Sequence, residues 1–151
     1  MKDERSIDGI IDISAKPLVP RLATAEGRVT LSKASVVAIR TSSVAKGDVI
    51  EASTIAALQA VKDTPRIIPH CHPVPIEGCR VTWEWHESDL ICTVQVKAHY
   101  RTGIEMEALT GVMAGLLCAW DMVKSLEKDD DGQYPETRIH GVRVLEKHKG
   151  T

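Results

Sequence analysis

A short segment between Pro69 and Pro75 combines side chains that bind metals, act as nucleophiles and transfer protons. It reads PHCHPVP and holds His70, Cys71 and His72. A residue that precedes a proline is biased toward extended conformations, so both imidazoles are expected on one side of the chain and the thiol on the other. The segment fits a zinc site, a nucleophilic cysteine, a purely structural loop or a loop that holds a ligand.

Two of these interpretations find little further support in the sequence. A zinc site needs at least a third protein ligand, and His86, His99 and His140 are available only through the fold. A nucleophilic Cys71 needs donors that stabilise an oxyanion, and no segment identifies them. We favour a ligand loop, in which rigid prolines fix imidazoles that contact an anionic or heterocyclic molecule, and keep the other three interpretations open.

A second group of reactive side chains lies on a predicted helix that spans residues 102–128. The helix is apolar between Met106 and Val123, but it is too short and too interrupted by acids to be a membrane span, so it is expected to be buried. At about 100° per residue, one narrow stripe of this helix is small and polar. The stripe consists of Glu107, Gly111, Ala114, Cys118, Asp121 and Ser125. Buried carboxylates at its two ends require cationic partners.

Lys124 follows Asp121 by three positions, so the two side chains can form an ion pair on one helix face. One interpretation is an ordinary surface pair. The apolar sequence LLCAWDMVK favours the other, a buried acid and lysine whose pKa values are coupled, as general acid/base catalysis uses.

The remaining pattern predicts an α+β domain with a ferredoxin-like, mostly antiparallel sheet. Strands are expected over residues 29–32, 80–86, 92–99 and 138–146, the second and third as a hairpin with SDL in its turn. Helices are expected over residues 32–40, capped by Ser32, over 49–63, capped by Asp48 and ended by Pro65, and over 102–128.

The 151 residues suffice for one domain, 1–151, in which residues 1–16 form an extended or partly flexible arm. Basic residues are scattered and the net charge is −2, which argues against a nucleic-acid partner. No signal peptide or membrane span is visible, so we expect a cytoplasmic protein with free thiols. The core contains no Phe, and such a thin core favours a homo-oligomer.

Five segments in order carry a family resemblance: IIDISAKP, KGDV, IPHCHPVPI, RTGIEMEALTGV and DMVK. The sequence resembles the cyclic pyranopterin monophosphate synthases, the molybdenum cofactor biosynthesis protein C family. The resemblance implies a ferredoxin-like subunit in a hexamer, a trimer of dimers, with active sites at a subunit interface. The implied reaction converts (8S)-3',8-cyclo-7,8-dihydroguanosine 5'-triphosphate into cyclic pyranopterin monophosphate and releases pyrophosphate.

The same resemblance assigns roles to individual residues. It implies no metal ligands and no required cofactor, and it leaves association of Mg²⁺ with the triphosphate open. His70 and Tyr100 depart from the Leu and Gly that are usual in the family. The implied catalytic residues are Asp121, Lys124 and Lys46, and the implied substrate-binding residues are His70, Cys71, His72, Met106, Glu107 and Arg21.

Overall fold

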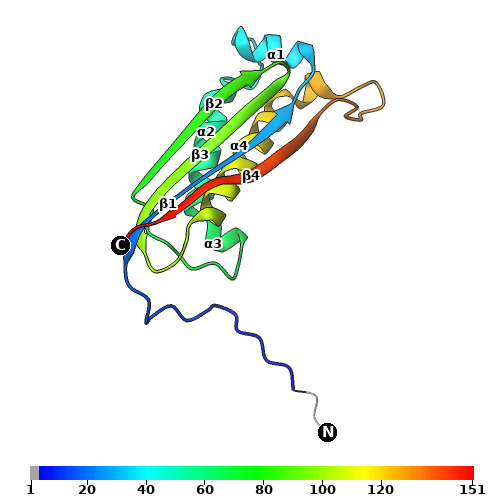
Figure 1. Ribbon diagram of the computed structural model, residues 1–151. Helices are drawn as coiled ribbons and strands as arrows, with labels where there is room; N and C mark the ends of the chain where they lie inside the picture. The colour runs from blue at the N-terminus through cyan, green and yellow to red at the C-terminus, as the bar shows by residue number, and fades with distance from the viewer. Residues whose placement is uncertain (1–3) are drawn as a thin grey trace.

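The computed structural model describes residues 4–151 and has a four-stranded antiparallel sheet with helices on one face (Figure 1). The spatial order of the strands is β2-β3-β1-β4. The ferredoxin-like α+β prediction is therefore confirmed. Along the chain the elements are β1 (Val19–Thr30), α1 (Lys33–Arg40), α2 (Val49–Lys62), α3 (Thr64–Ile67), β2 (Gly78–His86), β3 (Asp89–Tyr100), α4 (Glu105–Glu127) and β4 (Arg138–Lys149).

β1 is much longer than the sequence predicted, since it begins at Val19 rather than near Arg28. It lies between β3 and β4 and pairs with both. Near its middle it buries the small side chains of Ala23 and Ala25, whose low hydrophobicity leaves little strand alternation to recognise in the sequence. At Gly27 an added Cβ would lie 2.7 Å from a methyl group of Val112, so a glycine here lets α4 approach the sheet closely.

The β2–β3 hairpin confirms the predicted alternation. Trp83 and Trp85 of β2 and the apolar residues of β3 from Cys92 to Ala98 share the face that packs on the helices. The turn was misplaced, however. The strands separate at Glu87 and Ser88, and β3 already begins at Asp89. Glu87 adopts φ 54°, a left-handed conformation that the sequence does not reveal for a glutamate.

The caps of the first two helices were predicted correctly. The Ser32 side chain accepts from the Ser35 N–H, and the Asp48 side chain accepts from the Glu51 N–H. The end of α2 was predicted slightly too late, because α2 stops at Lys62. Pro65 instead lies in the first turn of the short helix α3, where its missing N–H costs no hydrogen bond.

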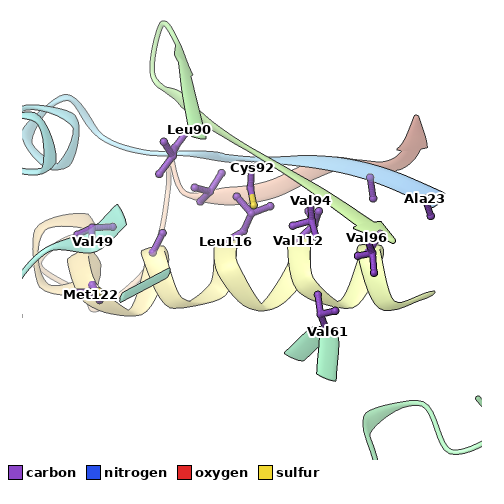
Figure 2. Close-up of a cluster of buried hydrophobic side chains, with 14 of the residues drawn as sticks. Ala23, Val49, Val61, Leu90, Cys92, Val94, Val96, Val112, Leu116 and Met122 are labelled. Carbon is purple, nitrogen blue, oxygen red and sulfur yellow. The ribbon is translucent and has the colours of Figure 1, made fainter. Parts of the chain in front are cut away.

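α4 is the central helix of the core, and Val112 and Leu116 point from it toward Cys92 and Val94 of β3 (Figure 2). The expectation that this helix is too short and too acidic to span a membrane is wrong, because its 23 residues are long and apolar enough. Half of its most apolar 18-residue stretch is nevertheless buried inside the domain. At Gly111 an added Cβ would lie 2.7 Å from a methyl of Val61 in α2. The small stripe therefore serves helix packing at its beginning, whereas at Asp121 and Ser125 it reaches solvent.

Candidate functional site

The PHCHPVP loop lines a cavity of about 330 Å³ at the N-terminal end of α4. The cavity brings together two segments that the sequence analysis singled out, the loop and the start of the helix. It is completed by the N-terminal arm through Ile11, Ile13 and Lys16. The predicted ligand residues at this end are His70, Cys71, His72, Met106 and Glu107.

The arm is fixed on the loop by both imidazoles. His70 Nδ1 contacts the carbonyl oxygen of Gly9, and His72 Nε2 lies 2.6 Å from the carbonyl oxygen of Ile11. Since a carbonyl oxygen only accepts, the imidazole N–H donates in each bond. The opposite nitrogen of each neutral ring is then left as an acceptor for another group. Residues 4–16 contain no helix or strand, and a turn closes where the Lys16 N–H donates to the carbonyl oxygen of Ile13 at 3.0 Å.

Glu107 is the buried charge of this cavity, with a relative exposure of 3%. Burial raises the pKa of its carboxyl group, and the nearby Glu105 charge raises it further. No ion pair joins Glu107 to a cation within residues 4–151, so the expected cationic partner is not found there. A ligand with N–H donors would satisfy this carboxylate.

Cys71 shares the cavity but is poorly suited to act as a nucleophile. Burial raises the pKa of its thiol, and the charges of Glu107 and Glu105 add to that effect. The reactive form of cysteine is the thiolate. The local electrostatics therefore favour a protonated thiol that lines the site.

The second group of predicted residues meets near the C-terminal end of α4. Asp121 Oδ1 lies 3.0 Å from Lys124 Nζ, and Asp121 Oδ2 lies 3.0 Å from Lys46 Nζ. Lys46 also donates to the backbone carbonyl of Asp121 at 3.2 Å. Lys46 comes from the α1–α2 connection, so the fold unites the KGDV and DMVK segments.

The expectation of a buried Asp121 is wrong, because its side chain is 55% exposed. Hydrogen bonds from Lys46 and then Lys124 lower the pKa of the Asp121 carboxyl, and the hydrogen bond to Asp121 raises the pKa of Lys124. Both partners are thus held in their charged forms. Two ammonium groups around one carboxylate leave a net positive charge, which suits the binding of an anion.

The two groups of residues do not form one site within the chain. Glu107 and Asp121 lie at opposite ends of α4, about 21 Å apart at the helical rise of about 1.5 Å per residue. In Figure 1, α3, which precedes the histidine loop, lies at one end of the sheet, and α1, which precedes the segment of Lys46, lies at the other. Arg21 belongs to neither group. It lines a third cavity of about 470 Å³ with Lys97, His99 and His148.

Several residues beside the two groups escaped sequence reasoning. Trp120 and Tyr134 pack edge to face at 5.1 Å and line a cavity of about 220 Å³ with Asp121 and Lys124. Tyr134 comes from a turn that looks merely solvated in the sequence. At the histidine cavity, Glu105 Oε2 is buried without a hydrogen-bond partner in the described part of the chain. The only feature of the sequence that could have pointed to Glu105 as a site residue was its position next to Met106 and Glu107.

The H-x-H pattern does not gain the third ligand that a zinc site would need. Among residues 4–151 no three His, Cys, Asp or Glu side chains converge in a way that could hold a metal ion. The side chains of His70 and His72 are instead engaged with the arm.

The sequence matches the model of the MoaC family over residues 10–150. It is 53% identical to a probable cyclic pyranopterin monophosphate synthase of Methanoregula boonei over 93% of this chain and 91% of that protein. A protein of Thermococcus kodakarensis with the same name is 47% identical over 98% and 94% of the two chains. A Methanothermobacter thermautotrophicus protein, named a probable cyclic pyranopterin monophosphate synthase accessory protein, is 47% identical over 97% and 92%.

Proposed function

The chain belongs to the MoaC family, and from that membership we propose that it is a lyase of molybdenum cofactor biosynthesis. Its substrate is (8S)-3',8-cyclo-7,8-dihydroguanosine 5'-triphosphate, and its products are cyclic pyranopterin monophosphate and pyrophosphate. The observation that carries this proposal is the near full-length similarity to relatives named for that synthase activity. The geometry of the two residue groups supports it.

Glu107 is suited to bind the guanine-type edge of the substrate. A carboxylate offers two acceptor oxygens to adjacent N–H donors, and such donors would offset the cost of keeping this charge buried. His70, Cys71 and Met106 line the same cavity and would shape it around the ring system. His72 keeps one ring nitrogen free to accept a proton during ring opening and reclosure.

Lys46 and Lys124 are suited to the phosphate end of the reaction. Forming a cyclic phosphate while pyrophosphate leaves builds negative charge on oxygen atoms, which fixed ammonium groups stabilise. Because the hydrogen bond to Asp121 raises the pKa of Lys124, Lys124 keeps its positive charge and is better suited to stabilise an anion than to act as a base. Asp121 orients both lysines. Arg21 would add a further positive charge from its own cavity.

We further propose that the active site is shared between subunits of a homo-oligomer, a hexamer built as a trimer of dimers. The solvent-facing side of α4 carries apolar side chains between the two groups, including Met113 at 54% exposure and Leu117 at 60%. Two α4 helices that pack antiparallel through this side would place Glu107 of one subunit near Asp121 of its partner. A two-fold axis would generate two such sites.

The proposal includes a cytoplasmic location, no required cofactor and no nucleic-acid or membrane partner, with Mg²⁺ association at the triphosphate left open. The test is conversion of the cyclic dihydro-GTP intermediate by purified, metal-stripped protein, with pyrophosphate and the pterin product followed together. Formation of both products, and loss of both in Lys124→Ala, supports the synthase. Binding without turnover would indicate a binding protein instead, and activity only after zinc is restored would indicate a metalloenzyme.

A further inference from the structure

The catalytic scheme leaves one buried carboxylate unused. Glu127, the last residue of α4, has a relative exposure of 6%. Its oxygens accept from the Ser32 N–H at 2.9 and 3.0 Å, from Ser32 Oγ at 2.5 Å, from Thr137 Oγ1 at 2.7 Å and from the Ser35 hydroxyl. Burial alone would raise the pKa of Glu127, but these hydrogen bonds hold it below its usual value. The group is therefore a fixed anion.

This anion joins two helices that are remote in sequence. Ser32 is the N-cap of α1, and Ser35 lies in the first turn of α1. A negative charge at a helix N-terminus is favoured by the helix dipole and by the free N–H groups. Glu127 therefore fixes the beginning of α1 on the last turn of α4.

The segment after α1 depends on α1 for its own position. The N–H groups of Thr41 and Ser43 donate to the carbonyl oxygens of Val37 and Ala38 in α1, at 2.9 Å each. Val44 anchors the same segment in the core. Lys46 follows two residues later.

α1 and its following segment thus meet α4 at two points. They meet Glu127 through Ser32 and Ser35, and they meet Asp121 through Lys46. Asp121 and Glu127 lie about 9 Å apart along the helix axis. The first contact is buried and held by several hydrogen bonds, whereas the second is exposed and depends on a flexible lysine. The buried contact at Glu127 can therefore determine where Lys46 lies relative to Asp121.

We propose that Glu127 is a positioning residue for Lys46: it clamps the start of α1 to α4 so that the ammonium group of Lys46 reaches the Asp121 carboxylate. The catalytic part of this inference rests on the proposed function, whereas the structural part does not. Glu127 itself lies away from the proposed substrate groups and acts only through Lys46.

The structural part is tested by titrating the Asp121 carboxyl group with carbon-detected NMR. Loss of the Lys46 hydrogen bond raises the pKa of Asp121, so Lys46→Ala sets the reference. Glu127→Gln is expected to raise this pKa as far as Lys46→Ala does, and Ser35→Ala is expected to raise it part of the way. Thr137→Val is the matched control, because it removes another buried hydroxyl from Glu127 but does not touch α1.

Ser35→Ala also keeps the test decisive if Glu127→Gln fails to fold. An unchanged Asp121 pKa in folded Ser35→Ala would overturn the proposal, and so would an equal rise in Thr137→Val. Neither outcome depends on turnover.

The catalytic part is tested by a double-mutant cycle on kcat. Glu127→Gln is expected to lower kcat by roughly 10- to 100-fold through misplacement of Lys46, and to cause no further loss in a Lys46→Ala background. Glu26→Gln, which removes a half-buried carboxylate that pairs with Arg143 on the sheet, is the control and should leave kcat unchanged. Equal losses in both backgrounds would overturn the positioning role. A wild-type protein without turnover would refute the proposed function, while the NMR titration would still decide the structural part.

Discussion

Glu107 and Asp121 project from opposite ends of one helix, about 21 Å apart along α4. Glu107 is buried in a cavity with the histidine loop, and Asp121 is exposed between two lysines. A rigid helix cannot bend these ends together. The proposed reaction uses both groups on one small substrate, and the proposed second copy of the chain would bring them together.

This separation predicts complementation between inactive variants. Glu107→Ala and Lys124→Ala should each be inactive alone, because every site in such an oligomer lacks one essential group. Random mixing of subunits by co-expression should restore about a quarter of the wild-type activity, since half of the dimers are mixed and each mixed dimer has one intact site. The measurement is specific activity of the mixed oligomer after its composition has been checked by mass spectrometry. An inactive mixture of correctly assembled subunits would place both groups of a site in one chain.

Replacing either lysine near Asp121 is expected to impair chemistry far more than folding. Lys46→Ala or Lys124→Ala should lower kcat by roughly 10²–10³-fold, which is typical when a preorganised donor to a developing anion is removed. Both side chains are exposed, so the thermal unfolding midpoint should change little. Lys128→Ala, one turn further along the chain, provides the control for loss of a charge. Activity in Lys46→Ala close to the wild-type value would remove Lys46 from the mechanism.

Glu107→Gln is expected to stabilise the unliganded protein while weakening substrate binding. The pKa of Glu107 is higher in the folded protein than in the unfolded chain, so the folded state binds more protons. Its stability is thus greatest below the unfolded pKa and declines as pH rises through the folded pKa. The variant has no such charge to bury.

Thermal unfolding between pH 4 and 8 should therefore show a steeper loss of stability toward neutral pH in the wild type than in Glu107→Gln. The KM of the variant should rise because one carboxylate acceptor is lost. Parallel pH profiles in the two proteins would mean that Glu107 is not the source of the decline.

Cys71→Ser is expected to retain turnover within a few-fold of the wild type. The raised pKa of this thiol leaves little thiolate at neutral pH, so serine can replace it as a polar lining group. The rate of Cys71 alkylation by iodoacetamide, followed by peptide mass spectrometry, should be slower than that of a free cysteine. Complete loss of turnover in folded Cys71→Ser would revive the nucleophilic interpretation of the loop.

Gly111→Ala should destabilise the domain by about 1–3 kcal/mol, as overpacking of a core does. The added methyl would lie 2.7 Å from Val61 and 3.3 Å from Val94, at the contact of α4 with α2 and the sheet. Urea unfolding measures this change. Gly78→Ala is the control, because its nearest neighbour, the Cβ of Lys97, lies at an ordinary 3.7 Å. An unchanged urea midpoint in Gly111→Ala would mean that α2 can move away without cost.

The sequence by itself determined the features that depend on spacing within one element. The alternation of apolar and polar residues in β2 and β3 predicted the hairpin. The capping side chains of Ser32 and Asp48 predicted where α1 and α2 begin. The three-residue spacing of Asp121 and Lys124 predicted their ion pair. Each rests on a period of 2 or 3.6 residues, which the chain carries locally. The ordered motifs identified the family for the same reason, because they are read along the chain.

Only the tertiary structure decided which distant segments meet. Packing brought Lys46 to Asp121, docked Gly9 and Ile11 on the histidine loop, and buried Glu127 against Ser32. It also exposed Asp121, although the surrounding apolar sequence predicted burial. A helix in a two-layer fold has one face on the sheet and another toward solvent, and the sequence of an almost uniformly apolar helix does not distinguish them. Burial and long-range contacts follow from how the layers pack.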